Sequence, residues 1–210
     1  MEYIKIPNIY KREEFGKNRL IIGDYSTDEL LVLKDIQWVW TEKVDGTNIR
    51  VIWDGYRVEF KGRTDKAQIP KELLARLEEL FGGESKEELF EQTFGQKEVI
   101  LYGEGFGGKI QGKNGYGETD FILFDVLVGN VFLERNNVES IATTFGIRVV
   151  PVVGVGTLNE AEHFIRDIPR SLLRDGNAEG IVCRPMVELR TRRGDRIIVK
   201  IKCRDFKGDR

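Results

Sequence analysis

Residues 42–51 read EKVDGTNIRV and lie between two strand-like runs, at 36–42 and 49–53. The segment Lys43-x-Asp45-Gly46 places a lysine where an apolar strand gives way to a loop. Partial burial and nearby cations disfavour the charged form of an amine, and the neutral form is a nucleophile. A surface lysine before an Asp-Gly turn has the same local sequence, so the rest of the chain must decide between these interpretations.

Short β-branched or aromatic runs recur along the chain and predict strands. They span 36–42, 49–53, 57–60, 99–103, 121–128, 131–133, 149–155, 180–184 and 197–201. Hairpin turns at Asp54-Gly55 and Gly129-Asn130 predict sheets that are largely antiparallel. Helical periodicity falls between these runs, and a capping box is expected from Ser85 to Glu88. The helical segments are 69–81, 85–94, 134–145 and 159–169. This irregular order of strands and helices predicts an α+β fold.

Length and composition predict one compact domain over residues 1–210. The chain has no linker rich in Ser, Gly or Pro, and 40% hydrophobic residues argue against a disordered or fibrous protein. Its two cysteines, Cys183 and Cys203, stand in strand-like runs outside any CxxC motif. We find no signal peptide and no apolar run near the roughly 18 residues of a membrane span. These features predict a soluble, cytoplasmic protein without a membrane partner.

The charge of the chain is balanced overall but uneven locally. Lys and Arg total 33 against 35 for Asp and Glu, which gives no indication of a nucleic-acid partner. Residues 181–210, however, contain ten Lys or Arg and four Asp or Glu. This basic segment could meet phosphates, although a solvated charged hairpin is the commoner explanation of such a run.

Four further stretches carry candidate functional residues. Arg63 lies in FKGRTDK, Glu104 in LYGEGFG and Glu179 in AEGIV, and Lys200 and Lys202 alternate in IIVKIKC. Each stretch alone has an ordinary explanation as a loop or strand-end charge. Their joint order is informative, because period-2 spacing puts both lysines on one face of a strand whose other face is apolar.

Together with Lys43, these residues resemble the motif set shared by DNA ligases, RNA ligases and mRNA capping enzymes. Within that superfamily of covalent nucleotidyltransferases, the chain is similar to RNA ligases of the bacteriophage RNA ligase 2 type. The similarity runs from about Trp38 to Cys203 and includes EKxxGTN, with Asn48 five positions past the lysine. Gln111 and the pair Phe124-Asp125 also match the pattern.

The chain departs from this pattern at two positions. That family often has His where Asp45 stands and Lys where Gly62 stands. Asp45 is instead similar to DNA ligases and capping enzymes, and the absent lysine removes one expected phosphate contact.

The resemblance implies an antiparallel-sheet nucleotidyltransferase (adenylation) domain, ATP-grasp-like with flanking helices, whose motifs line an ATP-binding groove. It implies an ATP-dependent RNA ligase that uses Mg²⁺ or Mn²⁺. Lys43 would attack the α-phosphorus of ATP and form a lysyl-AMP. The AMP would pass to an RNA 5′-phosphate, which a 3′-hydroxyl then attacks to join the ends.

The resemblance also implies roles for individual residues. The catalytic set is Lys43, Lys200 and Lys202. The ATP-binding set is Glu42, Lys43, Asn48, Arg63, Glu104, Phe124, Glu179, Lys200 and Lys202. Glu104 and Glu179 are the expected metal ligands, and Glu104 would also contact the ribose of the nucleotide. Phe124 would stack on adenine, although its apolar surroundings also suit a core aromatic, and Arg63 and Asn48 would contact the transferred phosphate or the 3′-hydroxyl end.

The short stretch after the last lysine motif keeps alternative functions open. Such ligases usually carry a C-terminal accessory domain, and only eight residues follow Lys202, so we expect none here. RNA with 5′-phosphate and 3′-hydroxyl ends, including a nicked duplex, would then be held by this domain, by the basic segment or by a protein partner. The alternatives are a GTP-dependent capping guanylyltransferase and a non-catalytic RNA-binding module that retains the fold.

Overall fold

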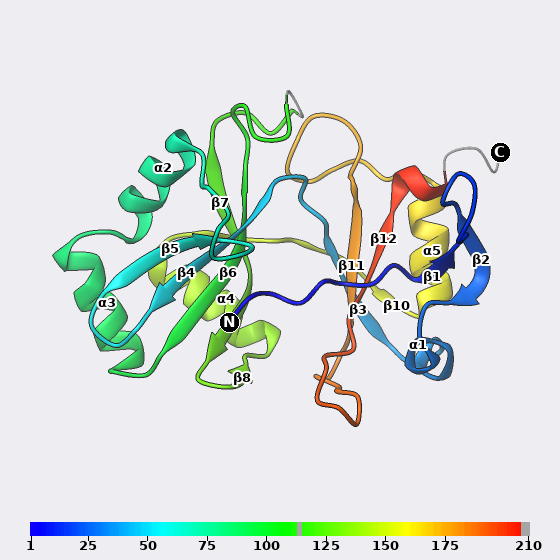
Figure 1. The fold of residues 1–210 in the computed structure, drawn as a ribbon, viewed down its shortest axis with the longest axis horizontal. Helices are drawn as coiled ribbons and strands as arrows, with labels where there is room; N and C mark the ends of the chain where they lie inside the picture. The colour runs from blue at the N-terminus through cyan, green and yellow to red at the C-terminus, as the bar shows by residue number, and fades with distance from the viewer. Residues whose placement is uncertain (113–114, 207–210) are drawn as a thin grey trace. The chain divides into compact units, whose positions relative to one another are not determined.

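A computed structural model describes residues 1–112 and 115–206, which fold into two compact units (Figure 1). Unit 1 comprises Met1–Ile4 and Asp45–Val150, and unit 2 comprises Lys5–Val44 and Pro151–Arg210. Both contain antiparallel strands with helices packed on them, which confirms the α+β prediction. The single domain expected from the length stays a prediction.

Unit 1 is built on a six-stranded sheet whose main path runs β5-β4-β6-β7-β8, with β9 paired to β7. All its strand pairs are antiparallel except β7 with β9. The strands are β4 (Thr47–Trp53), β5 (Val58–Gly62), β6 (Val99–Phe106), β7 (Asp120–Val128), β8 (Val131–Phe132) and β9 (Arg148–Val149).

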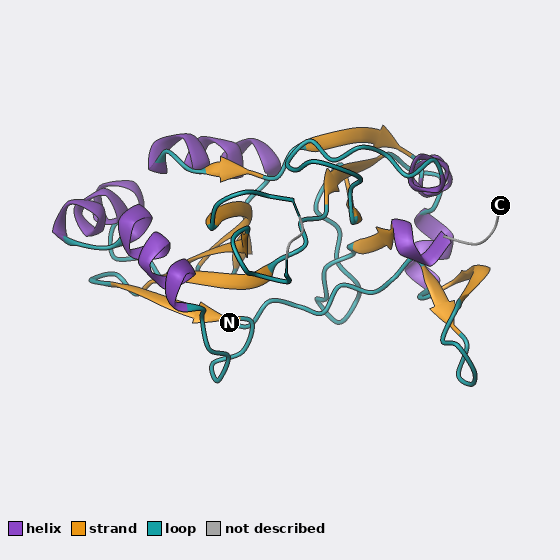
Figure 2. Ribbon diagram, turned by 90° about the horizontal axis from the view of Figure 1, so that it is seen from above, coloured by secondary structure: helices purple, strands orange, loops and turns teal. Residues whose placement is uncertain are grey.

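Three helices cover one face of this sheet, namely α2 (Lys71–Phe81), α3 (Glu84–Phe94) and α4 (Arg135–Phe145) (Figure 2). Their apolar side chains, including Leu77, Phe90 and Phe145, pack with Val51 and Leu101 of the sheet in one hydrophobic core. The alternate residues of β4 and β6 therefore lie on the opposite face, here called the open face because these three helices do not cover it.

Unit 2 contains a four-stranded sheet in the order β10-β3-β11-β12. It also contains a separate two-stranded sheet, β1-β2, whose strands precede β3 in the sequence. Trp38, Ile181 and Ile201 from this sheet pack with Leu158 and Ile165 of α5 in a second hydrophobic core. The elements are β1 (Tyr10–Arg12), β2 (Leu20–Tyr25), α1 (Asp28–Leu33), β3 (Trp38–Glu42), β10 (Val152–Gly156), α5 (Leu158–Arg166), β11 (Gly180–Pro185), β12 (Val199–Lys202) and the 3-10 helix η1 (Cys203–Phe206).

Two local predictions were wrong, and three elements near the N-terminus were missed. The capping box at Ser85 does not form, because α3 begins one residue earlier, with Gly83 as its N-cap and no side-chain cap. The strand predicted at 149–155 is two strands, β9 and β10, which belong to different units. The elements β1, β2 and α1 were not predicted, since they are only three to six residues long and too short to show a clear apolar period.

Candidate active site

Three neighbouring strands of unit 2 bring Lys43, Glu179 and Lys202 together. Lys43 directly follows β3, and its amide donates to the Gly180 carbonyl at the start of β11. Lys202 is the last residue of β12 and pairs in register with Gly180. Glu179, which precedes Gly180, therefore lies between the two lysines although it is far from both in sequence.

The Glu179 carboxylate bridges the two ammonium groups. Its Oε2 lies 2.5 Å from Lys43 Nζ, and its Oε1 lies 2.9 Å from Lys202 Nζ. All three side chains are mostly buried, with Glu179 and Lys202 each 15% exposed. Ion pairs this sheltered from water are screened less than surface pairs. The cluster is thus a fixed array of two cations around one anion.

This array controls the protonation of Glu179. Burial would raise the pKa of its carboxyl, but the Lys43 and Lys202 ammonium groups outweigh it and hold the pKa below its usual range. Glu179 is therefore an anion near neutral pH and a weak proton acceptor. In this state its lone pairs are directed at lysines.

Lys200 lies on the same face of β12 as Lys202. Val199 and Ile201, which alternate with these lysines, point into the core, as the period-2 spacing predicted. The segment before β1 runs along the free edge of β12, because the Lys200 amide donates to the Pro7 carbonyl and the Ile9 amide donates to the Lys200 carbonyl. Both predicted C-terminal lysines are therefore on a rigid strand.

Glu42, which the resemblance placed in the ATP-binding set, is buried at the end of β3. Its carboxylate is 2% exposed and accepts hydrogen bonds from the Ser171 hydroxyl and the Leu172 amide, the latter at 2.8 Å. These contacts fix the 171–174 turn against the end of β3. Its predicted nucleotide contact stays a prediction, and its observed partners give it a supporting role.

The open face of the unit 1 sheet carries Asn48 and Glu104 side by side. The two residues are direct cross-strand partners on β4 and β6. Asn48 Oδ1 is buried and accepts no hydrogen bond from any of the residues described, a costly arrangement unless something else satisfies it. Asn48 Oδ1 is thus suited to accept a hydrogen bond from a ligand, for example from a hydroxyl group.

Close backbone packing explains the glycine of the Lys43-x-Asp45-Gly46 motif. A Cβ on Gly46 would stand 2.2 Å from the Gly105 carbonyl oxygen, so no other residue fits. The Gly46 carbonyl accepts from Gln111 Nε2 at 3.1 Å, and the Asp45 amide donates to the Tyr116 hydroxyl at 3.0 Å. Gln111 therefore has a positioning contact with the motif loop.

Arg63 lies on an exposed loop just after β5. Within residues 1–112 and 115–206 its side chain has no hydrogen-bond or ion-pair partner, which leaves it available to an anion. The neighbouring Gly62, where similar ligases often have Lys, is buried, and a Cβ there would stand 2.8 Å from Ala67 Cβ. The fold of this loop thus excludes the missing lysine.

Phe124 sits at a shift in the register between β6 and β7. Tyr102 pairs with Asp125 and Gly103 pairs with Leu123, so Phe124 is an extra residue between them. Such bulges re-aim a side chain. Phe124 is half-buried and packs edge-to-face with Tyr3, with their ring centroids 5.0 Å apart, while the Tyr3 hydroxyl donates to Asp125 Oδ2 at 2.7 Å. Its predicted stacking on adenine stays a prediction.

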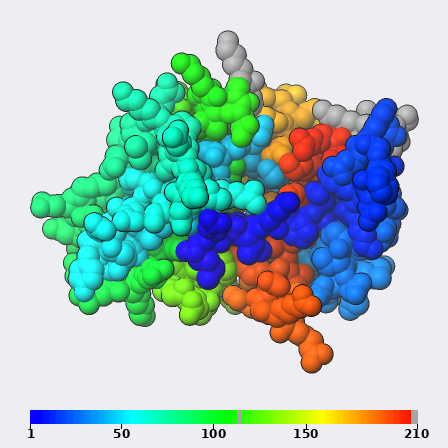
Figure 3. Space-filling model, viewed as in Figure 1, coloured from blue at the N-terminus to red at the C-terminus, as the bar shows by residue number. Residues whose placement is uncertain are grey.

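Residues 186–198 of the basic segment form the loop that connects β11 to β12, coloured orange to red in Figure 3. Arg196 is buried at its base and paired with Glu188, while Arg190, Arg192 and Arg193 are exposed. Because Gly180 pairs with Lys202, this loop lies at the opposite end of both strands from the lysine cluster. Residues 207–210 of the segment lie outside the described residues.

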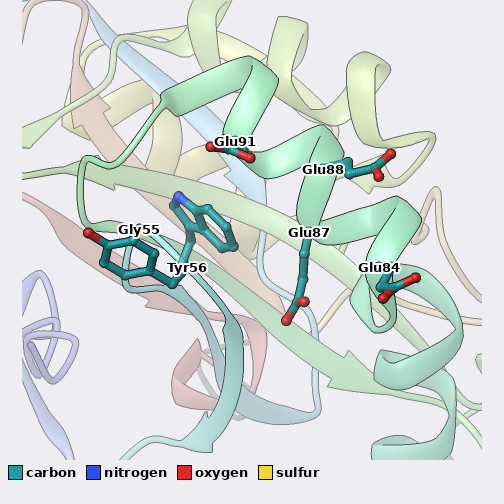
Figure 4. A pocket seen from close by; sticks show the side chains of 7 residues that line it. Gly55, Tyr56, Glu84, Glu87, Glu88 and Glu91 are labelled. Atoms are coloured by element: carbon teal, nitrogen blue, oxygen red, sulfur yellow. The ribbon is translucent and has the colours of Figure 1, made fainter.

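One pocket of about 250 Å³ in unit 1 contains none of the predicted site residues (Figure 4). Its acidic lining disfavours nucleotides and nucleic acids, which are anions. The lining residues are Trp53, Gly55, Tyr56, Glu84, Glu87, Glu88 and Glu91.

The described parts of the chain contain no group of three or more His, Cys, Asp or Glu that could hold a metal ion. None of the described helices is both long and apolar enough to cross a membrane.

Comparison with known structures links this fold to RNA ligases. A Naegleria gruberi RNA ligase with pyrophosphate is 20% identical, with a TM-score of 0.64 over 87% of this chain and 55% of that protein. A mutant of the same ligase with ATP and Mn is 18% identical, with a TM-score of 0.64 over 83% and 51%. An archaeal ATP-dependent RNA ligase is 15% identical, with a TM-score of 0.64 over 98% and 49%. The chain thus spans about half the length of these proteins.

The sequence pattern of the RNA ligase family matches residues 36–202. The match includes both groups of site residues, those around Lys43 in unit 2 and those around Asn48 in unit 1. The chain therefore belongs to the RNA ligase family.

Proposed function

We propose that this chain is an ATP-dependent RNA ligase that carries AMP on Lys43. The observation that carries the proposal is the cluster of Lys43, Glu179 and Lys202 at the ends of three adjacent strands. A lysine that only stabilised the fold would need no more than one ion-pair partner, and no second lysine on the same carboxylate. An amine that shares one carboxylate with a second lysine, with Lys200 on the same strand face as that lysine, suits the transfer of a phosphorus group.

In the first step, Lys43 Nζ attacks the α-phosphorus of ATP. A nitrogen–phosphorus bond forms, the bond from the α-phosphorus to the bridging oxygen breaks, and pyrophosphate leaves with the electron pair. Lys43 must first lose its contact with Glu179 and give up a proton to solvent, because Glu179 is a weak proton acceptor. The positive charges of Lys200 and Lys202 would stabilise the negative charge that grows on the phosphoryl oxygens.

The two later steps move the same phosphorus group and then release it. An oxygen of an RNA 5′-phosphate attacks the α-phosphorus and regenerates the Lys43 amine. A 3′-hydroxyl oxygen then attacks the 5′-phosphorus, and AMP leaves as the ends are joined. Arg63 is exposed and has no partner among the described residues, so it suits a contact with a phosphate. The buried Oδ1 of Asn48 is an acceptor and suits a contact with a hydroxyl.

A bound Mg²⁺ or Mn²⁺ would neutralise phosphate oxygens during these steps. The carboxylate of Glu104 in unit 1 and that of Glu179 in unit 2 are each a candidate ligand, directly or through water. Mg²⁺ keeps much of its hydration, so water and phosphate oxygens would supply further ligands.

Covalent labelling with radioactive nucleotide tests the proposal. We expect ATP with Mg²⁺ or Mn²⁺ to label the wild type, and Lys43→Ala to abolish labelling. Lys11→Ala is a matched control, because Lys11 is also ion-paired in unit 2 but lies on the surface. Labelling by GTP and not ATP would indicate a capping-type enzyme, and no labelling by either would indicate a binding module.

Nick sealing tests the substrate separately. We expect faster sealing when the 3′-hydroxyl strand at the nick is RNA than when both strands are DNA. Equal rates on the two nicks would contradict the preference for RNA while leaving the covalent chemistry intact.

A further inference from the structure

Arg50 is a charged side chain buried in unit 1. It lies in the middle of β4 and is 2% exposed. Ile49 and Val51 on either side point into the core under the helices, so Arg50 shares the open face of the sheet with Asn48. Its cross-strand partner Tyr102 is also buried, and donates to the Met1 carbonyl at 2.9 Å.

Burying a guanidinium costs free energy unless its donors are satisfied. Arg50 directs two of them into the loop after β5: Nε donates to the Gly62 carbonyl and Nη2 donates to Asp65 Oδ1, each at 2.8 Å. Asp65 itself is 69% exposed. A surface carboxylate is thus drawn to a buried cation, and the Arg50 guanidinium holds the pKa of Asp65 below its usual range.

The two contacts lie on either side of Arg63. Gly62 precedes it directly, and Asp65 follows it two residues later. The loop is also closed by a hydrogen bond from the Ala67 amide to the Thr64 carbonyl at 3.1 Å. The backbone around Arg63 is therefore held on both sides, while the side chain stays exposed and has no partner among the described residues.

From this geometry we propose that Arg50 is a positioning residue for the ligation reaction, which acts by fixing the loop that presents Arg63 to a substrate phosphate. The inference rests on the proposed function. A phosphate contact needs the arginine fork in a defined place, and a misplacement of about 1 Å can cost up to a hundredfold in rate. A buried arginine that served stability alone would gain little from pairing with an exposed side chain.

Asp65→Asn is the gentlest test, because it removes one anchor at the surface and leaves Arg50 in the fold. In single-turnover sealing of a nicked RNA duplex we expect about a fivefold lower rate, since a charge-assisted contact that is partly exposed is lost. Asp65→Glu should restore most of it. Glu79→Gln is the matched control, because Glu79 is an equally exposed acid paired with an arginine elsewhere in unit 1.

A double-mutant cycle separates positioning from a general structural effect. If Asp65 acts through Arg63, then adding Asp65→Asn to Arg63→Ala should change the rate by less than about twofold. A further fivefold loss in the double variant would overturn the inference, and so would an Asp65→Asn rate equal to that of Glu79→Gln.

Hydrogen exchange of peptides covering 61–67 gives a readout independent of catalysis. We expect faster exchange in Asp65→Asn and in Arg50→Met than in Glu79→Gln. Unchanged exchange in a protein that labels and seals would overturn this inference alone. A wild type that neither labels with ATP nor seals would overturn the proposed function, and with it a role for Arg50 in that reaction.

Discussion

Replacing Glu179 by Gln removes the anion that joins Lys43 and Lys202. The substitution loses charge-assisted hydrogen bonds of 2.5 and 2.9 Å and leaves two ammonium groups facing a neutral amide. Breaking a buried ion pair costs about 3–5 kcal/mol, and an exposed pair is worth about 1 kcal/mol or less. Since these side chains are 15–22% exposed, we expect a loss of about 2 kcal/mol in the free energy of unfolding.

For a chain of this length, a loss of about 2 kcal/mol lowers the melting temperature by about 4–8 °C. Thermal unfolding at pH 7 without nucleotide measures it. Asp24→Asn is the matched control, because it breaks an exposed ion pair with Lys11 in the same unit and should change little. In a Lys43→Met background the cost of Glu179→Gln should shrink, since one of the two partners is already absent.

The pH dependence supplies the refuting result. The pKa of Glu179 is lowered in the folded protein from its ordinary 4.5, so its contribution is present above about pH 4.5 and is lost as the pH falls through the folded value. Wild type and Glu179→Gln should therefore converge in stability at low pH. Equal melting temperatures at pH 7, or a difference that persists after the carboxyl is protonated, would refute the assignment of this carboxylate as the bridge between the lysines.

Three further predictions concern unit 1. Gly46→Ala should lower the free energy of unfolding by several kcal/mol and should also reduce ATP labelling, because its Cβ would stand 2.2 Å from the Gly105 oxygen. An unchanged thermal melt would contradict this close approach. Asn48→Ala should lower ATP labelling about tenfold or more without lowering the melting temperature, since the buried Oδ1 accepts nothing from the described residues; a parallel loss of stability would make Asn48 structural. Tyr3→Phe should cost about 1–2 kcal/mol in urea unfolding through the lost hydrogen bond to Asp125, and a neutral effect would show that the N-terminal segment does not anchor on β7.

The sequence predicted those features that depend on local pattern. Alternation in IVKIKC, residues 198–203, placed Lys200 and Lys202 on one face of a strand, and the helix predicted over 134–145 ends at Gly146, which adopts the left-handed conformation. Local pattern failed at α3, where the Ser85 capping signal was present but the chain begins the helix at Glu84, after a glycine. A helix start depends on tertiary packing as well as on the cap residue.

Features that depend on distant contacts could not be predicted. Glu179 was chosen by resemblance, but only the pairing of β3, β11 and β12 shows that one carboxylate bridges both lysines. Glu42 was expected at the nucleotide, and its partners Ser171 and Leu172 lie about 130 positions away. Arg50 was missed because an arginine within an apolar strand usually points to solvent. Its alternation with Ile49 and Val51 was the available signal, since it placed Arg50 on the same face as Asn48.

The central claim is that the Lys43 amine becomes covalently bound to AMP. After incubation with ATP and Mg²⁺, proteolysis and mass spectrometry should find AMP on the peptide that contains Lys43, and added pyrophosphate should remove it by reversing the first step. AMP on a different lysine, or an unmodified Lys43 peptide after incubation with either Mg²⁺ or Mn²⁺, would contradict the claim.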